Sequence, residues 1–348
     1  MKTKSFYQAM NMIYEHLMDE ESKLLFDMRI NFLITKNQDD YMERLREIYH
    51  DWTPSKELEE KISVLKPKEI IIFGCGFGGK TIKRMLPLWG YAAAYFCDNY
   101  QSGKIVDGLE VLAVDDMIKN HRDCLIIISS YEYAKDIFCQ LINRGISKDN
   151  ILADRMLIWS RGNQYLDVFK PQANEVYVDA GGYDGTSIIT FYQWAGENYK
   201  KSFVFEPVAS MCDVIRQRVV ADHIPEVEIC NYAVWNKKEK LMFAEDDSAS
   251  LVTKKGEYEV SGIEIDSVVK NEKVTFIKMD VEGSELNALE GAKQTILKNH
   301  PRLAICIYHK PEDIVEIPFY ILKLVPEYKF YIRHYTSHMW ETVLYAEV

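Results

Sequence analysis

A short apolar run that ends in an acidic, glycine-rich turn constrains this chain more than any other feature. Residues 176–187 read VYVDAGGYDGTS, so a predicted buried strand ends at Asp179, and Gly181 and Gly182 follow. Glycines have no Cβ and let the backbone approach a ligand closely. A turn that binds pyrophosphate would avoid the added carboxylate of Asp184, whereas a turn for a cationic ligand would favour it. The pattern therefore predicts a site for S-adenosylmethionine (SAM), which carries a sulfonium and an ammonium group and no phosphate, rather than for a dinucleotide.

The next two predicted strands also end in polar residues. The strand over residues 202–206 ends at Glu206, where a carboxylate can accept hydrogen bonds from both hydroxyls of a ribose. The strand over residues 227–231 ends at Asn231, whose amide is expected either to read the edge of the adenine or only to cap its own turn. These positions extend the predicted cofactor site along one edge of a sheet.

The fourth strand of this region, residues 274–279, leads directly into three acids. Asp280 stands at the carboxyl end of a central strand, where open α/β sheets bind ligands, so we expect it to contact the cofactor and to orient the acceptor or a base. Glu282 is expected to contact the acceptor, and Glu285 only to interact with the helix dipole. A divalent cation held by Asp280 and Glu282 is an open alternative, but two carboxylates give it little support and we predict no metal ligand.

Candidate catalytic histidines follow the fifth strand and lie in the predicted C-terminal hairpin. A sugar hydroxyl is a poor nucleophile until a base removes its proton, and an imidazole with a pKa near neutrality can remove it. We predict His309, at the tip of the strand over residues 302–308, as the first choice of base and His334 as the second. Tyr308 and Tyr335 are expected to contact the acceptor, because aromatic rings suit the apolar faces of sugars.

Residues 174–347 resemble the FkbM family of SAM-dependent methyltransferases. The family's strongest motif, K-x-D-x-E-G-x-E followed by L-x-G-A, is similar to residues 278–285 and 289–292, where Glu290 occupies the free position of the second part. The resemblance implies O-methylation, commonly of a sugar hydroxyl on a glycan, a glycolipid or a natural product. The first turn departs from the family pattern, because D-x-G-A-N is common there and this chain has DAGGYD over residues 179–184.

A second glycine-rich turn lies in the N-terminal half of the chain. An apolar strand over residues 70–73 leads into GCGFGG, which fits G-x-G-x-x-G and carries no acid. This turn is compatible with phosphate, and Asp98 lies at the tip of the next strand, as in a nucleotide-binding fingerprint. The region resembles the small Rossmann-like domain of sugar-modifying acyltransferases and methyltransferases, which implies a nucleotide-sugar bound by Gly74, Gly76 and Asp98. A domain that only packs and binds nothing is an open alternative.

The alternation of predicted strands and helices indicates an α/β fold. The predicted parts of the chain are a helical N-terminal segment (residues 1–66), a small doubly wound α/β domain (67–153), a linker (154–173) and a methyltransferase domain (174–348). The last part is expected to be a seven-stranded, Rossmann-like class I methyltransferase domain. Its predicted strands are residues 175–179, 202–206, 227–231, 274–279, 302–308, 328–333 and 341–347, the last two forming an antiparallel hairpin.

Charge and composition exclude several classes of protein. The 348 residues carry a formal net charge of -11 and no cluster of lysines and arginines, which argues against nucleic acid as a partner. No apolar run approaches the ~20 residues of a membrane span, and no secretory signal is recognised, so we expect a cytoplasmic protein. The 7 cysteines are scattered without a C-x-x-C pair, which indicates reduced core residues rather than a zinc site.

The sequence thus favours a SAM-dependent O-methyltransferase that modifies a sugar hydroxyl, with a homo-oligomer left open. One alternative is an NAD-dependent nucleotide-sugar oxidoreductase or epimerase that uses the Gly74 turn. That turn is not followed by a Y-x-x-x-K proton relay, since Tyr131 and Tyr133 precede Lys135 at the wrong spacing. The other alternative is a nucleotide-sugar-binding protein without catalysis, against which the intact acids at three strand tips argue.

Overall fold

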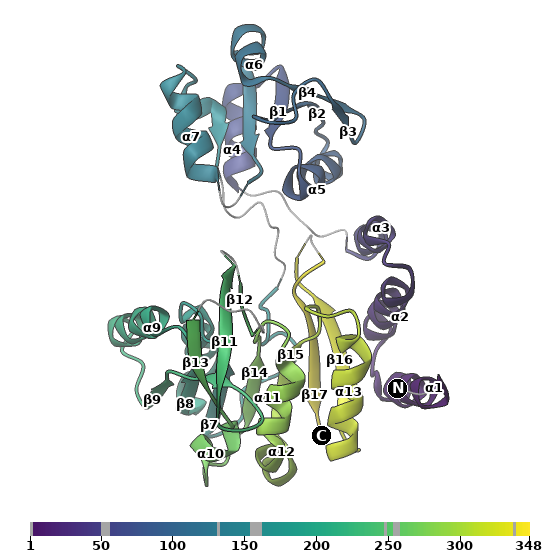
Figure 1. Ribbon diagram of the computed structural model, residues 1–348, viewed down its shortest axis with the longest axis vertical. Helices are drawn as coiled ribbons and strands as arrows, with labels where there is room; N and C mark the ends of the chain where they lie inside the picture. Colours follow the sequence, from purple (N-terminus) through teal and green to yellow (C-terminus); the bar gives the residue numbers. More distant parts are fainter. Residues whose placement is uncertain are drawn as a thin grey trace. The chain divides into compact units, whose positions relative to one another are not determined.

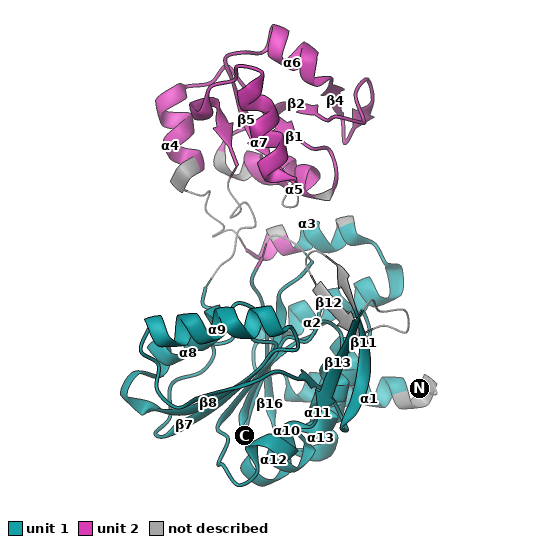
Figure 2. Cartoon of the chain, turned by 60° about the vertical axis from the view of Figure 1, so that its left-hand side comes forward, with its two compact units in different colours: residues 1–44, 162–335, 339–348 teal, residues 45–161, 336–338 magenta. Residues whose placement is uncertain are grey.

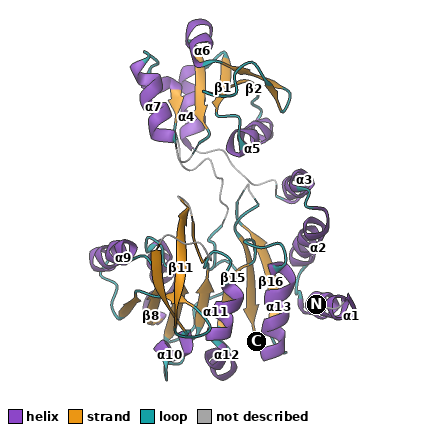
Figure 3. Cartoon of the chain, viewed as in Figure 1, coloured by secondary structure: helices purple, strands orange, loops and turns teal. Residues whose placement is uncertain are grey.

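The computed structural model describes residues 3–49, 56–130, 133–153, 162–246, 249–252, 258–336 and 339–348. Residues 154–161 of the predicted linker, and Tyr131, lie outside the described residues. The chain divides into two compact units (Figure 2): unit 1 is residues 1–44, 162–335 and 339–348, and unit 2 is residues 45–161 and 336–338. Both units combine helices with sheets (Figure 3), so the predicted α/β class is confirmed.

The central sheet of unit 1 has seven strands in the order β16-β17-β15-β14-β7-β8-β9 (Figure 1). These strands are β7 (Glu175–Ala180), β8 (Tyr199–Phe205), β9 (Val227–Cys230), β14 (Phe276–Met279), β15 (Arg302–Cys306), β16 (Lys329–His334) and β17 (Thr342–Glu347). The strands from β15 to β9 pair in parallel, and β17 is antiparallel to β15 and β16. The chain runs from β7 outward to β9 and then returns to β14 on the other side of β7. The strand order therefore reverses between β7 and β14, where open α/β sheets bind their ligands.

Helices cover both faces and one edge of this sheet. They are α1 (Thr3–His16), α2 (Glu20–Thr35), α3 (Gln38–Ile48, which the division between the units crosses), α8 (Thr186–Ala195), α9 (Ala209–Ala221), α10 (Ile265–Val269), α11 (Glu285–Gly291), α12 (Lys293–Asn299) and α13 (Asp313–Leu324). Figure 2 shows α8 and α9 on one face and α10 to α13 on the other. Along the edge, α2 packs against β16, where its N-cap Asp19 pairs with Arg333 at 2.6 Å. Polar contacts thus fix α2 to the edge of the sheet.

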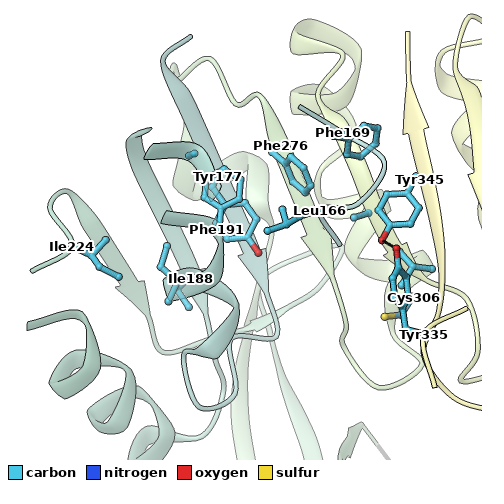
Figure 4. Packing of buried hydrophobic residues seen from close by; sticks show 14 of the residues in the cluster. Leu166, Phe169, Tyr177, Ile188, Phe191, Ile224, Phe276, Cys306, Tyr335 and Tyr345 are labelled. Atoms are coloured by element: carbon cyan, nitrogen blue, oxygen red, sulfur yellow. Dashed lines mark hydrogen bonds between the residues drawn. The ribbon is translucent and has the colours of Figure 1, made fainter. Parts of the chain in front are cut away.

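Aromatic side chains fill the core between this sheet and α8 (Figure 4). Tyr177 of β7 stacks on Phe191 of α8 with ring centroids 3.9 Å apart, and Phe276 of β14 packs edge-on against both. Phe169, which precedes β7, packs edge-on against Phe276 and Tyr345. All residues of β7 are buried, as expected for a parallel strand covered on both faces. The carboxyl ends of β7 and β14 are therefore held on a rigid base.

A second sheet, which the sequence analysis did not predict, is inserted between β9 and β14. Its strands are β10 (Ala233–Val234), β11 (Glu239–Asp246), β12 (Ala249–Val252) and β13 (Tyr258–Ile263), in the order β10-β13-β11-β12. Leu241, Phe243 and Val260 form its small apolar cluster, and buried residues alternate with more exposed ones along β13. This pattern is typical of a sheet with one covered face.

Unit 2 has a six-stranded sheet in the order β3-β4-β2-β1-β5-β6. Its strands are β1 (Glu69–Phe73), β2 (Ala93–Cys97), β3 (Ile105–Val106), β4 (Leu109–Leu112), β5 (Cys124–Ile128) and β6 (Ile151–Leu152), and its helices are α4 (Lys56–Leu65), α5 (Phe77–Met85), α6 (Val114–Asn120) and α7 (Ala134–Asn143). Because β1 pairs in parallel with β2 on one side and β5 on the other, the strand order of this sheet also reverses beside β1.

Among the residues that the structure describes, no helix is both long enough and apolar enough to cross a membrane.

Candidate functional site

The glycine-rich turn after β7 lies directly against the residue that follows β14. Gly181 has a φ of +84°, and a Cβ at this position would lie 1.9 Å from the carbonyl oxygen of Asp280. At Gly182 a Cβ would lie 2.4 Å from Cγ1 of Val204. Both positions therefore require glycine. The sequence analysis predicted that the backbone of this turn approaches a ligand closely, and in the structure it closely approaches the ends of two neighbouring strands. The structure brings the Asp179 turn and Asp280 together at the point where the strand order reverses.

A buried ion pair lies beneath this turn. Asp179 and Lys278 are partners in the pairing of β7 with β14, and Oδ1 of Asp179 lies 3.1 Å from Nζ of Lys278. Ser187 donates a hydrogen bond to Asp179, and Lys278 donates one to the carbonyl of Gly181 at 2.6 Å. Burial would lower the pKa of Lys278, but the charges of Asp179 and Asp280 outweigh it and leave that pKa above its ordinary value. Asp179 is completely buried, so its carboxylate acts on the turn through Lys278 and Ser187.

Glu206, at the tip of β8, reaches back to the same turn. Its Oε2 accepts the N–H of Tyr183 and its Oε1 accepts the N–H of Val208, both at 2.9 Å. Burial raises the pKa of Glu206 to about 6, although these two hydrogen bonds oppose the shift. Each carboxylate oxygen can accept more than one hydrogen bond, so the position suits the predicted contact with ribose hydroxyls.

Asn231 and Asp184 make structural contacts at the two sides of the site. The amide of Asn231 donates to the carbonyls of Glu206 and Pro207 at 3.0 and 2.9 Å, which corresponds to the turn-capping alternative of the sequence analysis. Asp184 accepts the N–H of Thr186 at the start of α8 and pairs with Arg218 at 3.0 Å. The predicted cofactor contacts of both residues stay predictions.

Asp280 is surrounded by hydroxyl and cationic groups. Tyr165 donates a hydrogen bond to Oδ2 at 2.8 Å, and Tyr308 donates one to Oδ1 at 3.2 Å. Burial alone would raise the pKa of Asp280, but the charges of Lys278 and His309 lower it below its ordinary value. Asp280 is therefore a firmly ionised carboxylate. Tyr165 lies within the predicted linker, and the sequence analysis assigned it no function.

His309 lies among three carboxylates. Its Nε2 is 3.1 Å from Oε2 of Glu282 and 3.5 Å from Oδ1 of Asp280, and its Nδ1 is 3.0 Å from Oε1 of Glu285. Burial would lower the pKa of His309, but the surrounding carboxylates raise it to about 11. The ring is therefore protonated at neutral pH and has no lone pair to accept a proton. The structure places His309 at the site, but the proton that the ring carries counts against its predicted role as a base.

Glu285 has a larger part in the site than the sequence analysis gave it. Its side chain is buried, and Oε1 accepts the N–H groups of Val281 and Gly283 at 3.0 and 3.3 Å. The same oxygen faces His309, so Glu285 links the loop after β14 to the loop after β15. Its position in the motif K-x-D-x-E-G-x-E was the available signal, but an acid at a helix start is also common as a partner of the helix dipole.

Glu341, just before β17, is a second residue that the sequence analysis missed. Its Oε1 lies 3.3 Å from the hydroxyl of Tyr308, which is also at hydrogen-bond distance from Asp280, and Gln164 donates to its Oε2. Burial, together with the charge of Asp280, raises the pKa of Glu341 to about 7. Tyr308 therefore bridges an ionised carboxylate and one that titrates near neutrality.

The two predicted residues of the last hairpin lie in different surroundings. His334 is buried on the edge strand β16, where its Nδ1 lies 2.8 Å from Oγ1 of Thr342 and its ring packs edge-on against Tyr41. The strands β17 and β15 separate β16 from β14. Tyr335 is a core residue whose hydroxyl lies 2.5 Å from that of Tyr345. A dashed line marks this contact in Figure 4. The geometry gives both residues packing roles, and their catalytic and acceptor-binding roles stay predictions.

In unit 2, the carboxylate of Asp98 closes the loops after β1 and β2. It accepts the N–H of Cys75 at 3.2 Å and the N–H groups of Tyr100 and Gln101 at 2.9 and 3.2 Å. Gly74 has a φ of +98°, and a Cβ on Gly76, the N-cap of α5, would meet open space. The nucleotide-sugar role of Gly74, Gly76 and Asp98 stays a prediction.

Comparison with protein families gives two matches. The family model described as methyltransferase FkbM domain matches residues 179–337, and the one described as C2185-like, N-terminal, matches residues 66–152. No curated protein matches the chain significantly.

Among solved structures, the FkbM methyltransferase of Methylobacillus flagellatus KT is similar over 92% of this chain and 100% of its own, with 18% identity and a TM-score of 0.51. An rRNA methylase of Streptococcus thermophilus (16% identity, 50% and 87% of the two chains) has a TM-score of 0.32. The fibrillarin of Aeropyrum pernix, solved with natively bound S-adenosyl-L-methionine (9% identity, 51% and 67%), has a TM-score of 0.33. The first likeness indicates a common fold, and we draw nothing from the other two.

Proposed function

We propose that this methyltransferase transfers the methyl group of SAM to a sugar hydroxyl. Residues 179–337 form an FkbM methyltransferase domain, which confirms the resemblance found in the sequence. The observation that carries the proposal is the meeting of the Gly181 turn with Asp280 between β7 and β14. A turn that only glycine can form and an ionised carboxylate share one edge of the sheet. This arrangement offers a binding surface for a cationic cofactor next to groups that can hold an acceptor.

The cofactor is proposed to lie along the tips of β7 and β8. The turn at Gly181 and Gly182 would receive the methionine part, and Glu206 would accept hydrogen bonds from the ribose hydroxyls. Lys278 supports this role indirectly, because it neutralises Asp179 and holds the carbonyl of Gly181 in place. The negative charge of Asp280 next to the turn favours a cofactor with a sulfonium group.

The acceptor is proposed to lie over Asp280, Tyr308 and Glu341. In the transfer, the bond from sulfur to the methyl carbon breaks as the oxygen–carbon bond forms, and the hydroxyl proton goes to a carboxylate. His309 carries a proton at neutral pH, so we assign the proton-accepting role to Glu341, whose pKa of about 7 suits a general base. Asp280 would orient the hydroxyl through a hydrogen bond. Alignment of the two reacting atoms supplies much of the rate in such a site.

The proposal is tested with full-length protein, SAM labelled in its methyl group, and a panel of nucleotide-sugars, glycolipids and glycans. We expect the label to appear on a sugar oxygen, and we expect Glu341→Gln to slow single-turnover transfer by about 100-fold or more. The matched control is Glu316→Gln, which removes an exposed carboxylate on α13 and should leave the rate unchanged. Transfer to a nitrogen or carbon acceptor instead, or an unchanged rate in Glu341→Gln, would overturn the substrate or the base, respectively.

A further inference from the structure

Three carboxylates converge on one side chain at the acceptor side of the site. The carboxylates of Asp280, Glu282 and Glu285 all lie within 3.5 Å of the ring nitrogens of His309. Two lysines near this cluster have other partners, since Lys278 pairs with Asp179 and Lys310 donates to the carbonyl of Gly283. One imidazole ring therefore faces three carboxylates, which is an arrangement that a divalent cation would stabilise.

Buried polar atoms in this cluster are left without hydrogen bonds. Oε1 of Glu285 accepts two backbone N–H groups, whereas Oε2 is buried and has no hydrogen-bond partner in the described part of the chain. Both ring nitrogens of His309 lie near carboxylates, but none of these contacts has hydrogen-bond geometry, and only 10% of the side chain is exposed. A buried carboxylate oxygen without a partner is costly, so the cluster has the character of an incomplete ligand set.

The spacing of these atoms suits a metal ion. One ligand atom from each of Asp280, Glu285 and His309 can be chosen so that all three lie within 4.8 Å of one another. Two oxygens bound to one ion at ~2.1 Å are at most ~4.2 Å apart. Asp280 faces Nε2 of His309 and Glu285 faces Nδ1, so a rotation of the ring or of one carboxylate would bring the three atoms around one ion. We propose that Asp280, Glu285 and His309 form a binding site for one divalent metal ion, with Glu282 beside it.

The ligand set indicates which ions would bind. One imidazole nitrogen and two carboxylate oxygens favour a borderline ion such as Mn²⁺ over soft ions, which prefer thiolates. A second cluster, Asp280 with Cys306 and Glu341, also has ligand spacing. In that cluster both carboxylate oxygens of Glu341 have hydrogen-bond partners, Tyr308 and Gln164, whereas buried atoms of Glu285 and His309 have none in the described part of the chain. The cluster at His309 is therefore the better site.

A role of this ion in methyl transfer rests on the proposed function, but the binding of the ion to the protein does not. A divalent cation at Asp280 would lower the pKa of an acceptor hydroxyl and hold it in front of the methyl group. It would also replace the proton on His309 as the partner of the carboxylates. Metal binding and SAM binding can be measured separately, so failure of one proposal does not imply failure of the other.

The test is a titration of chelator-treated, full-length protein with Mn²⁺, followed by electron paramagnetic resonance. We expect one bound Mn²⁺ per chain and a ¹⁴N modulation in the echo signal that identifies an imidazole ligand. Asp280→Asn and His309→Gln should weaken binding at least tenfold, and His309→Gln should remove the ¹⁴N modulation. The control Glu316→Gln makes the same change of charge as Asp280→Asn and should bind Mn²⁺ like the unaltered protein.

Thermal unfolding and SAM calorimetry on the same variants separate loss of the ion from loss of the fold. A His309→Gln protein that unfolds at the usual temperature and still binds SAM, yet has lost Mn²⁺, supports the proposal. Absence of bound Mn²⁺ at millimolar concentration in the unaltered protein, or a ¹⁴N signal that persists in His309→Gln, would overturn it. Bound Mn²⁺ without any SAM binding would support the metal site and count against the proposed function.

Discussion

In each unit the strand order reverses beside one strand, β7 in unit 1 and β1 in unit 2, and a glycine-rich turn follows that strand. The two turns differ in the side chains that the neighbouring strand places next to them. Beside Gly181, β14 supplies Lys278 below the turn, and Asp280, the residue after β14, lies against it. Beside Gly74, the described residues after β5 supply the uncharged hydroxyl of Ser129, which donates to the carbonyl of Gly74 at 3.0 Å. Two turns of similar sequence therefore have different chemistry, because the adjacent strand determines the charges around them.

Removal of the cation below the Gly181 turn should have the largest effect. Lys278→Met would leave the completely buried Asp179 without its partner, and breaking a buried pair in this way costs about 3–5 kcal/mol. The free energy of unfolding should fall by this amount in denaturant titrations. The double variant Asp179→Asn with Lys278→Met should recover much of the loss. If Lys278→Met were as stable as the unaltered protein, the buried cation would not distinguish the Gly181 turn from the Gly74 turn.

A Cβ tests the two turns directly. Gly181→Ala would place it 1.9 Å from the carbonyl oxygen of Asp280 at a positive φ, so we expect a loss of about 2–3 kcal/mol and much weaker SAM binding. Gly76→Ala is a control in the turn of unit 2, at a negative φ where a Cβ meets open space, and it should cost well under 1 kcal/mol. Thermal unfolding and calorimetry with SAM measure both variants. Equal losses in the two variants would contradict the comparison.

Glu206, at the tip of β8, tests whether SAM binds at the Gly181 turn and not at the Gly74 turn. Glu206→Gln keeps the shape of the side chain but removes its charge and one acceptor, so SAM affinity should fall by about 1–3 kcal/mol, or roughly 5- to 150-fold. Isothermal calorimetry gives this value, and circular dichroism checks that the fold is retained. In unit 2, Asp98→Asn should leave SAM affinity unchanged. A full SAM affinity in Glu206→Gln would remove this residue from the proposed site.

The smallest expected effect is a dependence of SAM affinity on pH. Burial raises the pKa of Glu206 to about 6, and the ionised form is the one that accepts two ribose hydroxyls. SAM affinity should therefore be constant above pH ~7 and fall by up to tenfold for each unit below pH ~6, since one proton must be released on binding. The same titration of Glu206→Gln should be flat between these values. A slope that persists in the variant would assign the titration to another group.

Local patterns were sufficient to locate most strands of the central sheet and the acids that follow them. Continuous apolar runs predicted the buried strands that became β7, β8, β14 and β15, and the polar residue directly after such a run marks a strand tip. The inserted sheet from β10 to β13 was missed. Its strands are short or only half-buried, and such segments give a weak period.

The amino-acid sequence by itself determined where the strands end and where glycine is needed, because these properties depend on neighbouring residues. Only the tertiary structure decided which side chains meet there. Tyr165 reaches Asp280 across 115 positions, and Tyr308 reaches Glu341 across 33. Partners so far apart leave no mark on local periodicity. The charge on His309 follows from three carboxylates between residues 280 and 285, and no pattern around residue 309 could have revealed it.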